Sequence, residues 1–369
     1  MFFVKLLDSI SGPYSVALDG RWGSGKTFFV KQAKMLLDVY NPFSQLTEWD
    51  VESHREKIKP AWDKLTKKHC KESWDPNPQL CVYFDAWEYD SEQDPLTALL
   101  YQITKVASND YSLKSKRNTI DIASSILELI SGRNFQKMFH SLKAKNSTND
   151  TQESFELRDK IEQYFTGLLP EHGDRLIIII DELDRCNPAF AVKLLERIKH
   201  YFTHEKITFV FSLNMEQMQH TVRQHYGIGF DAHKYIERFF DLIIPMPKLK
   251  RDRFRTLLCP DISRPAFQIA DAFAKMNRME MREITRYYTA LNMMTKVTTS
   301  PMRDYPSFWF CYHFLFPIAL GLQKCDISKY DRFINGDDSS PLIDLLSNET
   351  MLNNVLTFFK GLRKLTQNR

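Results

Sequence analysis

The sequence has few cysteines, and none of them lies in a pattern that would hold a fold together. They number six and are scattered, without a CxxC pair or a His/Cys cluster at zinc spacing: Cys70, Cys81, Cys186, Cys259, Cys311 and Cys325. This argues against a disulfide framework and against a structural zinc site. We expect reduced thiols in a cytoplasmic protein.

Long hydrophobic runs are also missing. The apolar stretches 120–130 and 307–322 are shorter than the roughly 20 residues of a membrane-spanning helix. The stretch 1–7 is interrupted by Lys5 and has no small-residue cleavage site, which argues against a signal peptide. We expect no transmembrane helix, leave peripheral membrane association open, and assign 307–322 to the core of a C-terminal helical bundle.

No single sign of charge dominates. The 369 residues carry a formal net charge of +4, so the overall balance favours no class of partner. A nucleic acid would need a local patch, and the basic stretch 54–71 offers one, with the aromatic Trp62 among its cations. The alternative is an ordinary solvated helix face.

The pattern of apolar residues predicts alternating strands and helices. Short apolar runs rich in β-branched and aromatic residues predict strands at 14–18, 80–87, 175–182 and 207–213. Helical spacing predicts helices at 28–37, 95–106, 154–169 and 189–202. The isoleucine run 177–180 indicates a strand that is buried on both faces.

A glycine-rich loop stands between the first predicted strand and the first predicted helix. It matches GxxxxGK[ST], in which backbone N–H groups and a helix N-terminus surround nucleotide phosphates. Lys26 should reach the β- and γ-phosphates, and the Thr27 hydroxyl should ligate magnesium. The expected nucleotide-binding residues are Gly20, Arg21, Trp22, Gly23, Ser24, Gly25, Lys26, Thr27 and Phe28.

An acid pair ends the isoleucine-rich strand, where open α/β sheets place their ligands. Asp181 should hold magnesium, and Glu182 should orient and deprotonate the attacking water. The alternative is a solvent-facing acid pair. The loop and the pair together predict an α/β fold in which helices sandwich the parallel sheet of a P-loop NTPase.

We expect two domains. The first is the P-loop domain, 1–247, with insertions at about 41–78 and 107–153. The second, 248–369, is a helical lid and a C-terminal helical domain.

Other polar residues are weaker candidates. Asn214 follows the next predicted strand and could contact the water or the γ-phosphate, or could be a simple turn residue. Lys234, Arg238 and Arg282 are candidate cations for the γ-phosphate. Each of these cations, taken alone, is more often a surface salt-bridge residue.

Several segments, in order, resemble the KAP family of P-loop NTPases, which belongs to the division that carries an additional catalytic glutamate. The matching stretches are 19–27, 84–89, 179–186, 229–240, 245–247 and 282–286. The resemblance implies a parallel sheet with the P-loop strand central, ATP and Mg²⁺ as ligands, and a helical lid after the sheet.

The resemblance also bears on single residues. Asp184-Arg185 matches a family signature, and Arg185 could pair with Asp184 or reach a neighbouring subunit's nucleotide. Trp87 is expected in the core, and Glu88 on the γ-phosphate side of the sheet. Many family members carry transmembrane helices after the P-loop region, whereas 107–153 is polar here.

The preferred function is a Mg-dependent ATPase that acts as an ATP-driven conformational switch. The family resemblance suggests a role in bacterial defence against phage or plasmid, and ATP rather than GTP. An oligomer is expected in which Arg185 or Arg238 is supplied in trans. Two alternatives stay open, a nucleotide-gated scaffold or membrane-associated assembly protein with little hydrolysis, and a nucleic-acid-dependent ATPase. A kinase is disfavoured because Glu182 beside the strand aspartate points to water as the acceptor.

Overall fold

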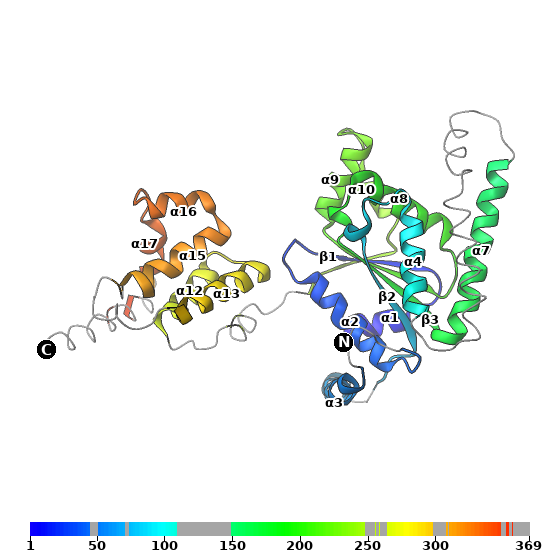
Figure 1. Ribbon diagram of the computed structural model, residues 1–369, viewed down its shortest axis with the longest axis horizontal. Helices are drawn as coiled ribbons and strands as arrows, with labels where there is room; N and C mark the ends of the chain where they lie inside the picture. The colour runs from blue at the N-terminus through cyan, green and yellow to red at the C-terminus, as the bar shows by residue number, and fades with distance from the viewer. Residues whose placement is uncertain are drawn as a thin grey trace. The chain divides into compact units, whose positions relative to one another are not determined.

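The computed structural model describes residues 1–44, 51–70, 74–108, 149–247, 264–297 and 310–347, with isolated positions at 255, 258, 308, 352, 353 and 356. The chain forms two compact units (Figure 1). One unit comprises Met1–Trp22 and Lys26–Met246, and the other comprises Gly23–Gly25 and Pro247–Arg369. Most of the expected insertion 107–153 lies outside the described residues. The other expected insertion, 41–78, contains helix α3, Val51–Cys70.

The first unit is built on a five-stranded parallel sheet with the order β2-β3-β4-β1-β5. The strands are β1 (Tyr14–Asp19), β2 (Gln79–Asp85), β3 (Arg175–Asp181), β4 (Ile207–Leu213) and β5 (Leu242–Pro245). The predicted α/β class is confirmed. The strand before the glycine loop, β1, is an interior strand between β4 and β5, whereas the central position belongs to β4.

Helices cover both faces of this sheet, as Figure 1 shows. One face packs on α1 (Phe2–Ser9), α2 (Lys26–Tyr40) and α3 (Val51–Cys70). The other packs on α4 (Pro95–Ser108), α7 (Asn149–His172), α8 (Pro188–Tyr201), α9 (Met215–Tyr226) and α10 (Ala232–Glu237). Alternate strand residues serve the two faces, so Ile177 packs with α2 and Ile178 with α8.

Two differences from the predicted strands matter for the site. The second strand ends at Asp85 rather than at 87, because Ala86–Tyr89 form a 3₁₀ turn. The Asp85 side chain caps this turn by accepting a hydrogen bond from the Trp87 amide. The short strand β5 was not predicted, since it has only four residues, lies at the sheet edge and is partly exposed.

Helices are the only regular secondary structure among the described residues of the second unit. Its helices are α12 (Pro265–Met276), α13 (Met281–Val297), α15 (Phe316–Cys325), α16 (Ile327–Ile334) and α17 (Ser340–Leu346). A π-helical turn, Cys311–Leu315, precedes α15. Phe314, Ile318 and Leu322 are buried, so the described part of 307–322 does contribute to a core. Within the described chain, no helix has both the length and the apolar character needed to cross a bilayer.

Candidate nucleotide-binding site

The glycine loop joins the end of β1 to the start of α2. Gly23 and Gly25 have φ angles of +79° and +91°, a region that favours glycine, which explains these residues in the pattern. The Gly20 amide donates to the Leu213 carbonyl at 3.2 Å and so ties the loop to the end of β4. The N-terminal turn of α2 follows directly, with the partial positive charge that attracts phosphate.

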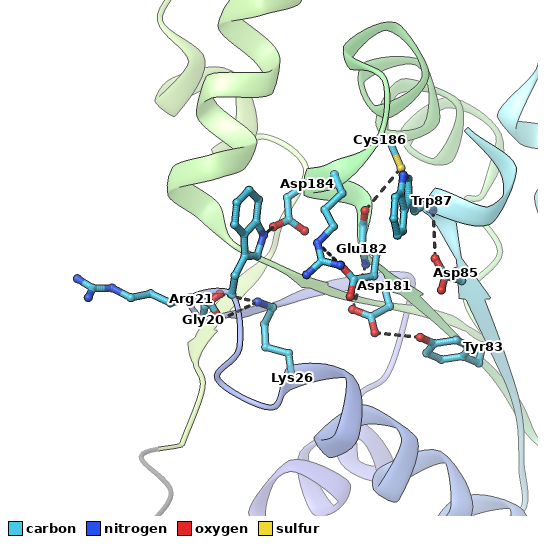
Figure 2. A network of polar contacts seen from close by, with 12 residues as sticks. Gly20, Arg21, Lys26, Tyr83, Asp85, Trp87, Asp181, Glu182, Asp184 and Cys186 are labelled. Atoms are coloured by element: carbon cyan, nitrogen blue, oxygen red, sulfur yellow. Dashed lines mark hydrogen bonds and ion pairs between the residues drawn. The ribbon is translucent and has the colours of Figure 1, made fainter. Parts of the chain in front are cut away.

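Lys26 lies in the first turn of α2 and is only 8% exposed. Its ammonium donates to the Gly20 carbonyl at 2.6 Å and to the Arg21 carbonyl at 3.2 Å (Figure 2). Burial lowers the pKa of Lys26, while the negative charge of Asp184 acts most strongly in the opposite direction. The amine that we expect to contact phosphates therefore bonds to its own loop in this structure.

Asp181 ends β3 and is 1% exposed. Its Oδ2 accepts a hydrogen bond from the Tyr83 hydroxyl at 2.9 Å, and its Oδ1 accepts one from the Glu182 amide at 3.0 Å. Burial and the charge of Asp181 raise the pKa of Tyr83, which therefore stays a donor. Tyr83 was missed in the sequence because its role requires β2 to lie beside β3.

A second carboxylate lies level with Asp181 on the neighbouring strand. The register pairs Asp85 of β2 with Asp181 of β3. Burial raises the pKa of Asp85, the Trp87 amide opposes this shift, and the charge of Asp181 adds to it. The carboxyl edge of the sheet thus gathers negative charge within reach of Lys26.

Glu182 has a left-handed backbone, with φ 60° and ψ 20°. For a residue with a Cβ this costs about 1–2 kcal/mol. The bend starts the 3₁₀ turn Leu183–Arg185, and it brings the Glu182 carboxylate to 2.7 Å from Nε of Arg185. Burial raises the pKa of Glu182, and the positive charge of Arg185 acts against that shift. Arg185 therefore pairs with Glu182, and not with Asp184 as one expectation had it.

Asp184 bonds instead to the glycine loop. Its Oδ2 accepts a hydrogen bond from the Trp22 indole at 2.6 Å. The Arg185 guanidinium carbon lies 5.7 Å from the Trp22 ring centre and 5.9 Å from the Trp87 ring centre, within cation–π range. Figure 2 shows Trp87 on the far side of Glu182 from Lys26.

Trp87 is 55% exposed, so its predicted place in the core is wrong. Its strand ends at Asp85, and the 3₁₀ turn carries Trp87 out of the alternating pattern that would have buried it. Trp22 and Phe28 are also exposed, at 45% and 68%. Glu88, in the same turn as Trp87, is exposed as well.

Asn214 follows β4, between the ends of β1 and β3 in the sheet order. Its side-chain oxygen caps α9, accepting hydrogen bonds from the amides of Glu216 at 3.1 Å and Gln217 at 3.4 Å. Of the two roles expected for Asn214, these contacts match that of a turn residue. The Met215 amide donates to Asp19 at 2.9 Å, so both β1 and β4 hold the start of α9.

The other predicted cations are exposed residues of helices. Lys234 is exposed on α10 and lies 3.7 Å from Asp231. Arg238 is exposed at the C-terminal end of α10. Arg282 is exposed on α13 in the second unit.

The basic stretch 54–71 forms most of α3. Lys67 and Lys68 are exposed, but Trp62 is 7% exposed and donates its indole N–H to the Trp74 carbonyl at 3.0 Å. Trp62 therefore cannot stack on a base, which corrects that part of the nucleic-acid interpretation. The Trp62 side chain is buried rather than exposed because it lies on the apolar side of an amphipathic helix.

Among the described residues, no group of three or more His, Cys, Asp or Glu side chains has metal-binding geometry. Asp181 nevertheless suits a hard cation, because each of its oxygens accepts one hydrogen bond, from Tyr83 or from the Glu182 amide, and retains further acceptor capacity. Thr27 lies one residue after Lys26 in the first turn of α2. Magnesium usually keeps several waters and needs only one or two protein ligands together with substrate phosphates.

A parallel sheet with a glycine loop between β1 and α2, a lysine in that loop and a buried aspartate at the end of β3 defines a P-loop nucleotide-binding domain. Sequence comparison then identifies the family. The KAP family P-loop domain matches residues 3–296, and the chain belongs to this family. A search of curated proteins found no match.

Proposed function

We propose that this chain is a Mg-dependent ATPase of the KAP type that works as an ATP-driven conformational switch. The observation that carries the proposal is the meeting of Lys26, Asp181 and Glu182 at one edge of the sheet. The charges of both acids contribute to the electrostatic environment of the Lys26 amine, so the three groups share one site.

Each residue has a defined part in this proposal. The loop amides and the α2 N-terminus bind the phosphates, and Lys26 leaves the carbonyls of Gly20 and Arg21 to meet the β- and γ-phosphates. Thr27 and Asp181 hold magnesium, with Tyr83 fixing the Asp181 carboxylate. When bound, magnesium neutralises charge that develops on the phosphate oxygens.

Glu182 orients the attacking water and accepts its proton, so that water rather than a second substrate receives the phosphoryl group. Asn214 caps α9 at the edge between β1 and β3, and in this role it links the site to that helix. A change at the site would thereby reach α9 and the helices beyond it.

An arginine supplied by a second copy of the chain would complete the site in an oligomer. Arg185 is held by Glu182 within its own chain, whereas Arg238 is exposed, which favours Arg238 for the trans role. Arg282, on the helical second unit, is the candidate from a lid. Mixing an Arg238→Ala chain with a Lys26→Ala chain tests the trans role, because recovery of turnover in the mixture requires a shared site.

One observation supports the alternative of a nucleotide-gated scaffold with little hydrolysis, namely that the proposed base Glu182 is paired with Arg185. The alternative of a nucleic-acid-dependent ATPase is supported by the exposed lysines of α3, but its tryptophan is buried and gives no support. A cytoplasmic location, peripheral membrane association and a role in defence against phage or plasmid are proposals that follow the sequence pattern and the family resemblance.

The test is phosphate release from ATP and from GTP by wild type, Lys26→Ala and Glu182→Gln, with nucleotide binding measured in parallel. We expect wild type to turn over ATP, Lys26→Ala to lose binding, and Glu182→Gln to bind with a rate lower by about 10²–10⁴-fold. Binding without turnover by wild type, unchanged by DNA or RNA, would favour the scaffold.

A further inference from the structure

Glu182 and the glycine loop are connected through Arg185. The Arg185 Nε lies 2.7 Å from the Glu182 carboxylate, and its guanidinium faces the rings of Trp22 and Trp87. Trp22 belongs to the loop itself, and its indole N–H bonds to Asp184, the residue before Arg185. One short segment, 182–185, is therefore attached to the loop by a hydrogen bond and by a ring contact.

We propose that Arg185 is a positioning residue that holds the Glu182 carboxylate in an ion pair while no nucleotide is bound, and that movement of Trp22 on nucleotide binding releases it. The inference rests on the proposed function, because it concerns how the ATPase site becomes active. It differs from a role of Arg185 on the phosphates or on a neighbouring subunit.

The geometry gives the reason for holding. A carboxylate oxygen that accepts a charge-assisted hydrogen bond from Nε is directed at the guanidinium and not at a water molecule. The side chains of Glu182 and Arg185 are only 16% and 21% exposed, so solvent screens their attraction less than it would at the surface. In this proposal the pair is a resting arrangement that opens before Glu182 serves as a base.

The geometry also indicates what opens it. Trp22 stands between Gly20 and Gly23, which permit the loop backbone to change on both sides of the indole when phosphate enters. Lys26, whose carbonyl partners are Gly20 and Arg21, leaves them in the same step. Both changes would move Trp22, which bonds to Asp184 and faces Arg185. Closure of the loop on phosphate would thereby weaken the ion pair between Arg185 and Glu182.

The first test separates kcat from KM. Arg185→Gln should raise the kcat for ATP by about fivefold, the scale expected for one partly screened charge-assisted bond, with KM within about twofold of wild type. Arg185→Lys keeps the charge but lacks the planar fork, and should give a smaller increase. In a Glu182→Gln background, Arg185→Gln should give no increase. Arg158→Gln, which removes an exposed arginine of α7 that bonds to the Thr203 hydroxyl, is the control.

The second test is spectroscopic. Binding of a non-hydrolysable ATP analogue to wild type should change tryptophan emission, because the Trp22 indole leaves Asp184 and Arg185. Trp22→Phe should bind the analogue and lose most of that change, although the other tryptophans remain. Analogue binding that leaves wild-type emission unaltered would overturn the role of Trp22.

A fall in kcat for both Arg185 variants would show that Arg185 acts on the reaction itself and would overturn the positioning role, as would an unchanged kcat. If Arg185→Gln does not fold, as judged by thermal unfolding, Arg185→Lys decides. If wild type and both variants bind ATP and none hydrolyses it, the proposed ATPase function fails as well. If wild type hydrolyses ATP and the variants are no faster, the inference alone fails.

Discussion

The hydroxyl of Tyr83 donates a 2.9 Å hydrogen bond to Oδ2 of Asp181, across the boundary between β2 and β3. This bond fixes the orientation of the carboxylate that we expect to hold magnesium. It also couples the second strand of the chain to the strand that ends in the acid pair.

Tyr83→Phe should therefore weaken magnesium use. Loss of an outer hydrogen bond to a metal ligand typically lowers metal affinity by about 10–100-fold, and we expect the lower end because the Glu182 amide still bonds Asp181. The measurement is the magnesium concentration that gives half-maximal ATP turnover. Tyr101→Phe, an exposed tyrosine on α4, is the control, and equal magnesium curves for the two variants would contradict the role of Tyr83.

Gly25→Ala should lose nucleotide binding and also some stability. Its φ of +91° would strain an alanine by about 1–2 kcal/mol. Gly12 has a φ of +89° and open space around it, so Gly12→Ala should carry a similar strain and leave nucleotide affinity intact. Thermal unfolding and nucleotide titration of both variants separate strain from function. Equal loss of affinity would mean that strain alone accounts for the effect.

Glu182→Gly should be more stable than Glu182→Gln by about 1 kcal/mol. Both variants lose the ion pair with Arg185, but only glycine relieves the left-handed backbone. The measurement is the denaturant midpoint of each variant, with the wild type as reference. A less stable glycine variant would show that the bend is held without strain.

Two helical glycines should respond in opposite ways to alanine. Gly167, on α7, has nothing within 4 Å of an added Cβ, so Gly167→Ala should stabilise the protein by about 0.5–1 kcal/mol. A Cβ at Gly321, on α15, would lie 2.5 Å from the Phe273 ring, so Gly321→Ala should destabilise by about 1–3 kcal/mol. Unfolding curves of the two variants provide the comparison. Stabilisation in both would contradict the close approach of Gly321 to Phe273, and destabilisation in both would contradict the open space at Gly167.

The parts of the site that follow from contiguous sequence were predictable. The glycine loop and the acid pair each follow a buried strand, and the parallel topology brings those strand ends to one edge. Tyr83 was beyond sequence reasoning, because it lies 98 positions from its partner Asp181 and meets it only through strand order.

The pair between Glu182 and Arg185 was missed for a different reason. It depends on a left-handed backbone conformation at Glu182, which the residue type does not predict. The sequence pattern misplaces Trp87 because a large apolar residue directly after a strand looks like part of that buried strand, whereas the strand ends two residues earlier. For Trp62 the error is the reverse. Its basic neighbours indicate an exposed side chain, whereas its indole is buried.

The contacts of Lys26 with its own loop have a consequence for measured affinities. Because its ammonium already donates to the carbonyls of Gly20 and Arg21, the proposed binding of phosphates by Lys26 would exchange one set of partners for another. Under the proposed function, a measured affinity for ATP would be a difference between two bonded states and would understate how strongly the loop holds phosphate. The same two carbonyls give the buried Lys26 ammonium hydrogen-bond acceptors when phosphate is absent. The loop can therefore stay folded between successive nucleotides.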